Sequence, residues 1–467
     1  MLSFHKYYLS LLVCTLLLFI TGCGNAQVAS EIEVVNLLDD SAMFVTVDTS
    51  YNFIDYNANH LVFFDSTQLR RFAEKWYYVL ATGKGNVNIM QLGSSHVQGG
   101  TFPHRLRYNM ISPVKNLAAA RGMIFPYSAA VKCNNPYDYK VSRSREFVLT
   151  RNVYKEPDQL LGLCGIAVTA ADSLADICIT LSEPDIDFAT DRIVLLGHSV
   201  GGVTPLVMLH DSQGGADTVE PSKIDIDHRR YYFQLPEAVD SFHIVLPCTE
   251  GQSFAITGVY LDNGRPGISY HSIGVNGSTL SDYLDRCPHF TQDLELVNPD
   301  LVIFCIGIND ATGTNFDTVL FKNRYLRLVD SIRSVNPECA FVFATNNDSF
   351  RRVKRKYSVN ENGLLAREAF YRIAQCSGGA VWDQFAVMGG LGSMETWKNN
   401  ELAQRDMIHF TRKGYQLLGD LLSNAILEAV AKFKPLRPEL YQNKKSKKAR
   451  KDNDLKSEDE RYNYISY

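Results

Sequence analysis

The chain has 467 residues, of which 45% are hydrophobic and 21% are charged. This composition is ordinary for a globular protein and excludes a wholly disordered one, and the length favours two globular units over one. The formal net charge is -4. Without a basic excess, nucleic-acid binding has no electrostatic support.

The N-terminus has the pattern of an export signal. Lys6 supplies a short positive region, and an apolar run follows over residues 9–20. That run is too short to span a membrane but suits the core of a secretory signal. The next residues end at Cys23 and resemble the lipobox of bacterial lipoproteins. The resemblance implies a signal peptide over residues 1–22 and a lipid on Cys23; a plain signal peptide cut near Ala26 is the alternative.

The part of the chain after the signal predicts a helix and then a buried strand. Residues 23–59 are expected to form an irregular lead-in or linker. Residues 66–81 predict a helix, because Ser66 can cap it and apolar side chains recur at helical spacing. Residues 86–92 predict a short buried strand, which Gly93 ends.

The C-terminal half alternates between short apolar strands and helices. The predicted strands cover residues 301–306, 340–344 and 380–382, and the predicted helices cover residues 316–334, 363–376 and 414–433. Such alternation predicts an α/β fold with a parallel sheet that helices cover on both faces. Right-handed crossovers then place the carboxyl ends of the strands at one edge of the sheet, where sites form.

The middle of the chain, residues 129–267, has a different pattern. It contains β-like runs with turn signals and little helical periodicity. Examples are residues 145–150, 177–181, 192–196, 242–246 and 254–260. This pattern predicts an antiparallel β-sandwich. The flanking parts, 60–128 and 268–436, have together the size of one α/β domain, so the sandwich is expected as an insertion into that domain. The charged tail, 437–467, is expected to be disordered.

The cysteines and histidines give no sign of a metal site. Eight cysteines follow Cys23, and an even number in an exported protein permits disulfides, whose pairing the sequence leaves open. Cys305 lies in an apolar run and is expected in the core. Neither Cys-x-x-Cys nor His-x-x-x-His spacing occurs, so we expect no metal and no other cofactor.

Two short segments at predicted strand ends carry groups suited to acyl transfer. Ser94 and Ser95 follow Gly93, and a serine at a strand-to-helix turn lies near N–H groups that favour a developing negative charge. A helix-capping serine is the alternative. The second segment, 273–279, contains Gly277, whose backbone can approach a substrate closely. An ordinary turn is the alternative here.

Two further segments supply an amide and a carboxylate–imidazole pair. Asn309 follows the most apolar predicted strand, where its amide can donate to an oxyanion. Asp406 precedes His409 by three residues. A carboxylate at that spacing can hold the imidazole tautomer and leave the other ring nitrogen to take a proton from a serine. Each pattern alone also fits a simple turn.

Together and in this order, the four segments resemble the blocks of the SGNH (GDSL-type) hydrolases. The resemblance implies a three-layer α/β/α fold with a flavodoxin-like parallel sheet. It implies that Ser95 is the nucleophile, that His409 is its base and that Asp406 orients His409. It also implies an oxyanion hole formed by the N–H groups of Ser95 and Gly277 and the amide of Asn309.

Two other serines compete with Ser95. The first block of the family usually has an Asp where this chain has Ser94, which puts the level of activity and the choice of nucleophile in question. Ser199 lies in a Gly-x-Ser-x-Gly segment, 197–201, that matches the nucleophile elbow of α/β-hydrolases. The elbow requires a helix after the serine, whereas residues 202–205 are poor helix formers. We therefore expect a β-hairpin turn at this segment.

A finer resemblance concerns the substrate. His96 directly after the serine, residues 120–122 before the insert and residues 382–390 resemble peptidoglycan O-acetylesterases and related lipoproteins, in which a carbohydrate-binding-like β-sandwich interrupts the hydrolase. The resemblance implies an acetylesterase that removes O-acetyl groups from peptidoglycan or another polysaccharide. The alternatives are a general short-chain aryl or lipid esterase and a non-catalytic glycan-binding lipoprotein.

The insert and the N-terminus give two last expectations. Aromatic side chains of the insert are expected either to hold the glycan beside the cleft or to fill the core; they are Tyr137, Tyr139, Tyr231, Tyr232 and Phe233. A lipid on Cys23 implies membrane attachment in the bacterial cell envelope. No acidic cluster follows this cysteine, which favours the periplasmic side of the outer membrane. The oligomeric state stays open.

Overall fold

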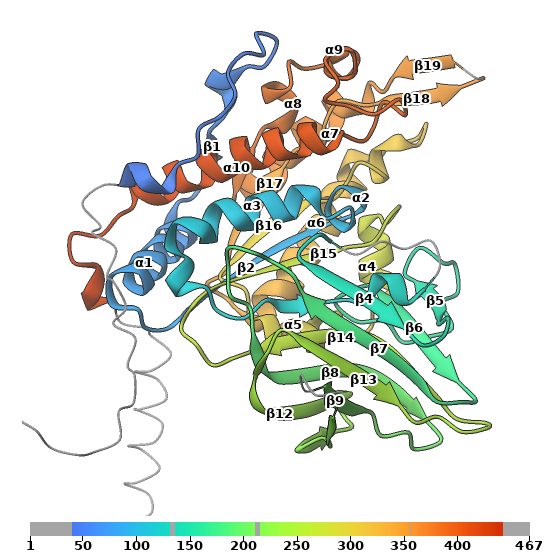
Figure 1. The fold of residues 1–467 in the computed structure, drawn as a ribbon. Helices are drawn as coiled ribbons and strands as arrows, with labels where there is room; N and C mark the ends of the chain where they lie inside the picture. The colour runs from blue at the N-terminus through green and yellow to red at the C-terminus, as the bar shows by residue number, and fades with distance from the viewer. Residues whose placement is uncertain (1–39, 131–135, 211–214, 355, 442–467) are drawn as a thin grey trace, which may run out of the picture. The chain divides into compact units, whose positions relative to one another are not determined.

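The computed structural model describes residues 40–130, 136–210, 215–354 and 356–441 (Figure 1). The predicted signal peptide, Cys23 and most of the predicted lead-in lie outside the described residues, as do residues 442–467 of the predicted tail. At residues 438–440, a 3₁₀ helix contacts α1 (Thr67–Thr82). None of the helices in the described part of the chain is long and apolar enough to cross a membrane.

A six-stranded sheet forms the centre of the α/β part. Its strand order is β1 (Leu61–Phe63), β20 (Ala380–Trp382), β17 (Ala340–Ala344), β16 (Leu301–Cys305), β2 (Asn86–Gly93) and β15 (Gly267–Gly274). Neighbouring strands run parallel except β1, which pairs antiparallel with β20. Numbered by chain order, the five parallel strands have the order 2-1-3-4-5, which is the flavodoxin-like arrangement. The predicted fold class is confirmed.

Helices cover both faces of this sheet and make three layers (Figure 1). One layer contains α1, α3 (Thr101–Ile111) and α10 (Arg412–Lys432). The other contains α4 (Leu280–Arg286), α5 (Phe290–Val297), α6 (Thr318–Val335) and α7 (Asn362–Ser377). The sheet strands between these layers are almost wholly buried, which explains their continuous apolar runs.

Shorter elements complete the α/β part. They are the helices α2 (Ser95–Gln98), α8 (Gln384–Val387) and α9 (Ser393–Asn399), the 3₁₀ helices at 40–43, 56–58, 112–117, 127–129 and 310–312, and a hairpin of β18 (Phe350–Val353) and β19 (Lys356–Val359). The sequence pattern did not predict β1 or this hairpin.

The predicted elements of this part agree with the structure to within about two residues at most ends. Two helix starts differ in detail. Ser66 occupies the position before α1 but makes no capping side-chain hydrogen bond, so the predicted cap is wrong. Helix α6 begins at Thr318 rather than at 316, because the side chain of Asp317 accepts from the N–H groups of Val319 and Leu320.

Two antiparallel sheets form the predicted β-sandwich. One has the strand order β10 (Ala216–Val219), β9 (Leu206–His210), β13 (Ser241–Leu246), β7 (Ala175–Leu181) and β4 (Tyr139–Arg143). The other has the order β11 (Lys223–Asp225), β12 (Arg230–Val239), β8 (Thr190–Val200), β14 (Ser253–Asp262), β6 (Ile166–Ala171) and β5 (Val148–Arg151). The strand predicted from residue 145 starts only at 148.

The sandwich is joined to the α/β part through backbone pairing and not only through its two chain connections. Strand β3 (Gly122–Ile124) pairs antiparallel with β14. After β14 the chain enters β15 of the central sheet within a few residues. The buried apolar residues of both parts belong to one continuous cluster.

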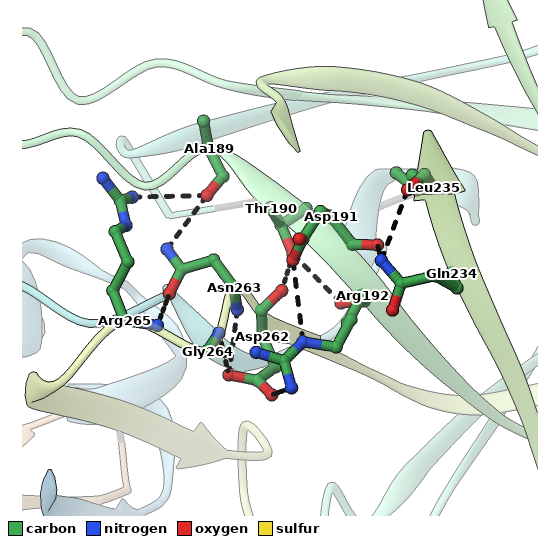
Figure 2. A network of polar contacts seen from close by, with 10 residues as sticks. All are labelled: Ala189, Thr190, Asp191, Arg192, Gln234, Leu235, Asp262, Asn263, Gly264 and Arg265. Carbon is green, nitrogen blue, oxygen red and sulfur yellow. Dashed lines mark hydrogen bonds and ion pairs between the residues drawn. The ribbon is translucent and has the colours of Figure 1, made fainter. Parts of the chain in front are cut away.

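Polar contacts fix the chain where it leaves the sandwich (Figure 2). At the end of β14, the backbone carbonyl of Asp262 accepts from the Thr190 hydroxyl at 2.5 Å. The side-chain carboxylate of Asp262 lies 3.4 Å from the guanidinium of Arg192. The next residue, Asn263, donates its side-chain amide to the carbonyl of Ala189 at 3.0 Å. These contacts tie the return segment to the start of β8.

A buried ionic cluster joins the two parts deeper in the fold. The carboxylate of Asp138, just before β4, lies 2.7 Å from the guanidinium of Arg107 on α3 and also accepts from Arg121, just before β3. All three side chains are buried. Burial acts to raise the pKa of Asp138, but the two guanidinium groups outweigh it and lower that pKa well below its usual range.

The cysteines described by the structure are all unpaired. They are Cys164, Cys178, Cys248, Cys287, Cys305, Cys339 and Cys376. Cys133 lies outside the described residues.

Candidate active site

Ser95 lies directly beyond the carboxyl end of β2. The strand ends at Gly93, where a Cβ atom would lie 2.3 Å from Val97 and 2.7 Å from the carbonyl oxygen of Cys305, so only glycine fits. Ser95 is the first residue of α2, which is a single turn. Gly100, with φ +80°, then breaks the chain before α3. A helix therefore follows the strand at the serine, as expected, but it is a single turn.

The structure brings Ser95, His409 and Asp406 into a hydrogen-bonded chain. The hydroxyl oxygen of Ser95 lies 2.7 Å from Nε2 of His409. Nδ1 of the same ring lies 2.7 Å from a carboxylate oxygen of Asp406. Ser95 and His409 are 314 residues apart in the sequence, so the fold and not local geometry creates this contact. The chain has the order that a hydroxyl, a base and an orienting carboxylate need for nucleophilic attack.

The loop before α10 holds the carboxylate of Asp406 in place. Its other oxygen accepts from the backbone N–H groups of Ile408 and His409, each at 3.0 Å. Burial acts to raise the pKa of Asp406, but the hydrogen bonds from the His409 side chain and from these N–H groups outweigh it and lower the pKa to about 2. The carboxylate therefore stays charged at all ordinary pH values and fixes the ring of His409.

Asn309 and Gly277 lie beyond the neighbouring strands. Asn309 follows β16, and its side-chain amide donates to the carbonyl of Ser278 at 2.9 Å. An amide has two N–H groups, so one remains for a substrate oxygen. Gly277 follows β15 with φ +86°, a conformation that favours glycine, and a Cβ atom there would lie 3.9 Å from Val153, which is an ordinary contact.

The predicted site residues lie at one cleft of about 580 Å³. Ser95, Gly277, Asn309 and His409 all contribute to its wall, and Asp406 lies behind His409. Strand β2 lies between β15 and β16, where the strand order of the sheet reverses. The cleft therefore lies at the topological switch point, where open α/β sheets bind their ligands.

Comparisons with known proteins agree with this arrangement. Residues 256–417 match the model of the GDSL-like lipase/acylhydrolase family. A solved structure of a peptidoglycan O-acetylesterase aligns with a TM-score of 0.64 and 20% sequence identity, covering 80% of this chain and 99% of the other. Residues 256–417 thus carry a GDSL-like lipase/acylhydrolase domain, which is the domain of an esterase. The structural alignment shows that the fold is shared.

Other similar structures cover less of the chain. An acetyl xylan esterase aligns with 18% identity and a TM-score of 0.28, over 34% of this chain and 81% of the other. A GDSL-like lipase from Bacteroides thetaiotaomicron aligns with 18% identity and a TM-score of 0.27, over 34% of this chain and 76% of the other. No curated protein matches the sequence.

The family match includes three of the four sequence blocks of the SGNH domain. Gly277, Asn309 and the Asp406–His409 pair lie within the matched residues, whereas Ser95 lies before them. The insert separates Ser95 from the later blocks in the sequence. In the structure, Ser95 lies in the same cleft as the residues of the later blocks.

The two adjacent serines of the SGNH domain differ in their surroundings. Ser94 is fully buried, and its hydroxyl has no hydrogen-bond partner among the described residues. Ser95 lies on the cleft wall against His409. The replacement of the usual Asp by Ser94 thus leaves a small polar side chain beneath the cleft rather than a second group in it.

Ser199 lies elsewhere, within β8. Its backbone pairs with Phe254 of β14, so it sits in a regular strand and not at a strand-to-helix turn. Gly197 is explained by packing, because a Cβ atom there would lie 2.4 Å from the ring of Phe254. The predicted hairpin turn is also wrong. Gly201 and Gly202, both with positive φ, carry the chain from β8 to β9 in the other sheet.

One of the five aromatic residues predicted to hold a glycan lies at the cleft. The ring of Tyr137 lines it and is 48% exposed. Tyr139, Tyr231 and Phe233 are buried core residues, and Tyr232 stacks against Lys223. The alternation of side chains along β12 explains the difference, because Tyr231 and Phe233 point into the sandwich.

A second hollow extends the cleft toward the sandwich. It has a volume of about 350 Å³ and shares Thr101, Tyr137 and Arg412 with the cleft. The loop between β7 and β8, at Glu183 and Asp185, forms its far wall. Residues of both parts of the molecule therefore line one continuous depression that leads away from Ser95.

The sequence did not predict the contact between His96 and Tyr415. This buried histidine lies with its ring centre 5.2 Å from that of His409, and its Nδ1 lies 2.8 Å from the hydroxyl of Tyr415 on α10. Burial and the neighbouring His409 lower the pKa of His96 to about 3, so it is uncharged. The only sequence signal is its position after Ser95, and nothing local links it to a tyrosine 319 residues away.

Proposed function

We propose that the chain removes O-acetyl groups from a glycan through an acyl-enzyme intermediate on Ser95. The hydrogen-bonded chain from Ser95 through His409 to Asp406, at 2.7 Å and 2.7 Å on the wall of an open cleft, is the observation that carries the proposal. A nucleophile, a base and an orienting carboxylate aligned at one cleft favour catalysis over simple binding.

The geometry supports a two-step reaction. Nε2 of His409 takes the proton of the Ser95 hydroxyl as its oxygen attacks the ester carbonyl carbon. The free N–H of Asn309 and the backbone N–H groups of Ser95 and Gly277 stabilise the negative oxygen. The intermediate collapses to acetyl-Ser95, and His409 returns the proton to the leaving sugar hydroxyl. Water then attacks the acetyl group with His409 again as base, which releases acetate and restores Ser95.

The surroundings of the cleft favour a glycan as substrate. The cleft continues into the hollow beside the sandwich, so a polymer bound at Ser95 has a surface along which to extend. Tyr137 presents an aromatic ring at the junction, and sugar rings pack on such faces. A solved structure that aligns over 80% of the chain is a peptidoglycan O-acetylesterase, which supports an acetylated glycan without identifying it.

Two measurements test the proposal. Acetate release is measured from O-acetylated peptidoglycan and from acetylated xylan, and hydrolysis rates are compared for 4-nitrophenyl esters of increasing acyl length. We expect acetate release from a polymer and a preference for acetyl. A preference for long acyl chains without polymer activity would favour a general lipid or aryl esterase.

A covalent probe separates the esterase from a non-catalytic glycan-binding protein. A fluorophosphonate should label the chain, and mass spectrometry should find the adduct on Ser95. A folded protein that stays unlabelled would favour the binding protein.

We further propose attachment to the periplasmic side of the outer membrane through a lipid on Cys23. The lipobox-like segment supports this, and Cys23 itself lies outside the described residues. Cys23→Ala should release the protein from the membrane fraction into the soluble fraction. Protease treatment of intact cells should leave the native protein uncut; membrane retention of the variant or cleavage in intact cells would contradict the anchor or its location.

A further inference from the structure

The hairpin of β18 and β19 concentrates positive charge in a chain whose formal net charge is -4. Residues 350–360 contain five basic residues and no acidic one. Arg352, Lys354 and Lys356 are exposed, and Arg351 is half-buried; Arg355 lies outside the described residues. Among the ion pairs of the described residues, none involves any of these four basic side chains.

The hairpin is attached to the loop that carries the catalytic pair. The N–H of Phe350 donates to the carbonyl of Met407 at 3.0 Å, and Met407 directly follows Asp406. Just before the hairpin, the Asn347 amide donates to the carbonyl of Ile408, beside His409, at 3.0 Å. Figure 1 shows β18 and β19 extending outward from the α/β part beside α9. The base of the hairpin is therefore fixed to the loop that brings His409 to the cleft.

The register of the hairpin separates an anchored base from an exposed end. Phe350 faces Val359 across the two strands, and Phe350 packs against the core. Two positions further along the same face, Arg352 faces Tyr357, whose side chain is 47% exposed. Side chains of successive pairs alternate between faces, so Lys356 lies on the opposite face. Positive charge is thus present on both faces of the exposed end.

We propose that this hairpin binds the carboxylates of an anionic glycan whose acetylated sugar lies at Ser95. The proposal rests on the proposed function and narrows its substrate class. A polymer that extends from the cleft over this hairpin meets cations that no acidic side chain neutralises. The exposed ring of Tyr357 adds a face on which a sugar can pack beside the guanidinium of Arg352.

The positive charges of the hairpin also have a purely structural explanation. A two-stranded hairpin has two open edges, and exposed Lys or Arg on edges prevents pairing with other chains. That reason would hold for a hairpin at any place on the molecule. It does not explain why this hairpin is tied to the loop of His409.

The test compares two triple variants with equal loss of charge. Arg352→Gln, Lys354→Gln and Lys356→Gln are combined in one protein. Lys84→Gln, Lys115→Gln and Lys223→Gln, at exposed positions outside the hairpin, are combined in the control. Kinetics are measured on soluble O-acetylated peptidoglycan fragments, whose stem peptides carry carboxylates, on neutral acetylated xylan and on 4-nitrophenyl acetate.

We expect the hairpin variant to raise KM for the peptidoglycan fragments about 3- to 30-fold, as for the loss of three exposed ionic contacts, with kcat unchanged. KM for xylan and for 4-nitrophenyl acetate should stay the same, and the control should behave as the native protein. The difference on peptidoglycan should vanish near 1 M salt, where the screening length falls to about 3 Å. An unchanged KM for the anionic substrate in the hairpin variant would overturn the proposal.

A binding measurement separates this proposal from the esterase. The native protein, the hairpin variant and the control are sedimented with de-O-acetylated peptidoglycan sacculi, so that no ester is needed. If only the hairpin variant binds the sacculi more weakly, the hairpin site is supported. This holds even if no acetate is ever released, an outcome in which the proposed esterase function fails but the hairpin site does not. Binding to phosphatidylglycerol vesicles is measured in parallel. Equal binding of all three proteins to the sacculi overturns the proposal. Weaker binding of the hairpin variant to the vesicles alone also overturns it, because that result would assign the hairpin to a membrane.

Discussion

Asn309 donates its side-chain amide to the carbonyl oxygen of Ser278, 2.9 Å away. The contact fixes the orientation of the amide, and Asn309 lines the same cleft as Ser95. It also connects the end of β16 to the loop that carries Gly277. Two of the three donors proposed for the oxyanion hole, the Asn309 amide and the Gly277 N–H, are therefore linked by this contact.

Asn309→Ala should lower kcat roughly 10²- to 10³-fold with a smaller change in KM, because a preorganised donor acts mainly on the transition state. Asn362→Ala is a matched control. Its amide also donates to backbone carbonyls, those of Ala311 and Gly313, but it does not line the cleft. A rise in KM alone for the Asn309 variant, measured with 4-nitrophenyl acetate, would show that this amide only binds the ground state.

The second prediction concerns the nucleophile. Ser95→Ala should reduce ester hydrolysis by roughly 10⁴-fold or more, as for the loss of a triad serine. Ser94→Ala and Ser199→Ala should keep most of the activity, because Ser94 is buried beneath the cleft and Ser199 lies within a strand of the sandwich. Initial rates of the three folded variants check this. Loss of turnover in the Ser199 variant alone would mean that another site does the chemistry.

The third prediction concerns the buried ionic cluster. Asp138→Asn should lower the free energy of unfolding by about 3–5 kcal/mol, because it leaves Arg107 and Arg121 buried without a counter-charge. Urea unfolding measures the change. Glu428→Gln removes the exposed pair with Lys432 on α10 and should change stability by less than about 1 kcal/mol. Equal effects of the two substitutions would contradict a structural role for the cluster.

The fourth prediction concerns pH. Burial raises the pKa of Asp310 from 3.8 to about 7, against the opposing hydrogen bond from the N–H of Leu280. Between these two values the folded chain keeps a proton that the unfolded chain has lost, so rising pH favours unfolding. The stabilising effect of the proton is complete below the lower value and is lost as pH rises through about 7.

Asp310→Asn removes this titration. Thermal unfolding midpoints of the native protein and the variant should therefore diverge as pH rises from about 4 to 8, with the native protein losing stability relative to the variant. Curves that stay parallel over this range would show that Asp310 is ionised in the folded state at low pH, as an exposed carboxyl would be.

Most of the α/β part is predictable from the sequence because its strands are buried on both faces. Continuous apolar runs such as that of β16 mark such strands without ambiguity, and short connections then favour parallel pairing. Strand β1 has only three residues, and it pairs with β20 more than 300 residues later. No local pattern indicates a pairing over that distance.

In the site, too, some features are predictable from the sequence and others are not. The residue types of Ser95, Asn309, Asp406 and His409 are visible in short motifs at strand ends. The hydroxyl of Tyr415 beneath His96 is not, because the contact depends on how α10 lies against α2 and α3. In the sandwich, the sequence indicates strands but not which of their faces points inward, so the core positions of Tyr231 and Phe233 follow only from the packing of the two sheets.

The pairing of β3 with β14 limits how this protein can change by recombination. A binding module on a flexible linker can be exchanged like a cassette, whereas here the seam between insert and enzyme is itself a pair of hydrogen-bonded strands. A chimera cut at the two chain connections alone would leave β3 with an open edge and an exposed apolar face. New substrate ranges are therefore more accessible through changes in the loops around the cleft than through replacement of the whole insert.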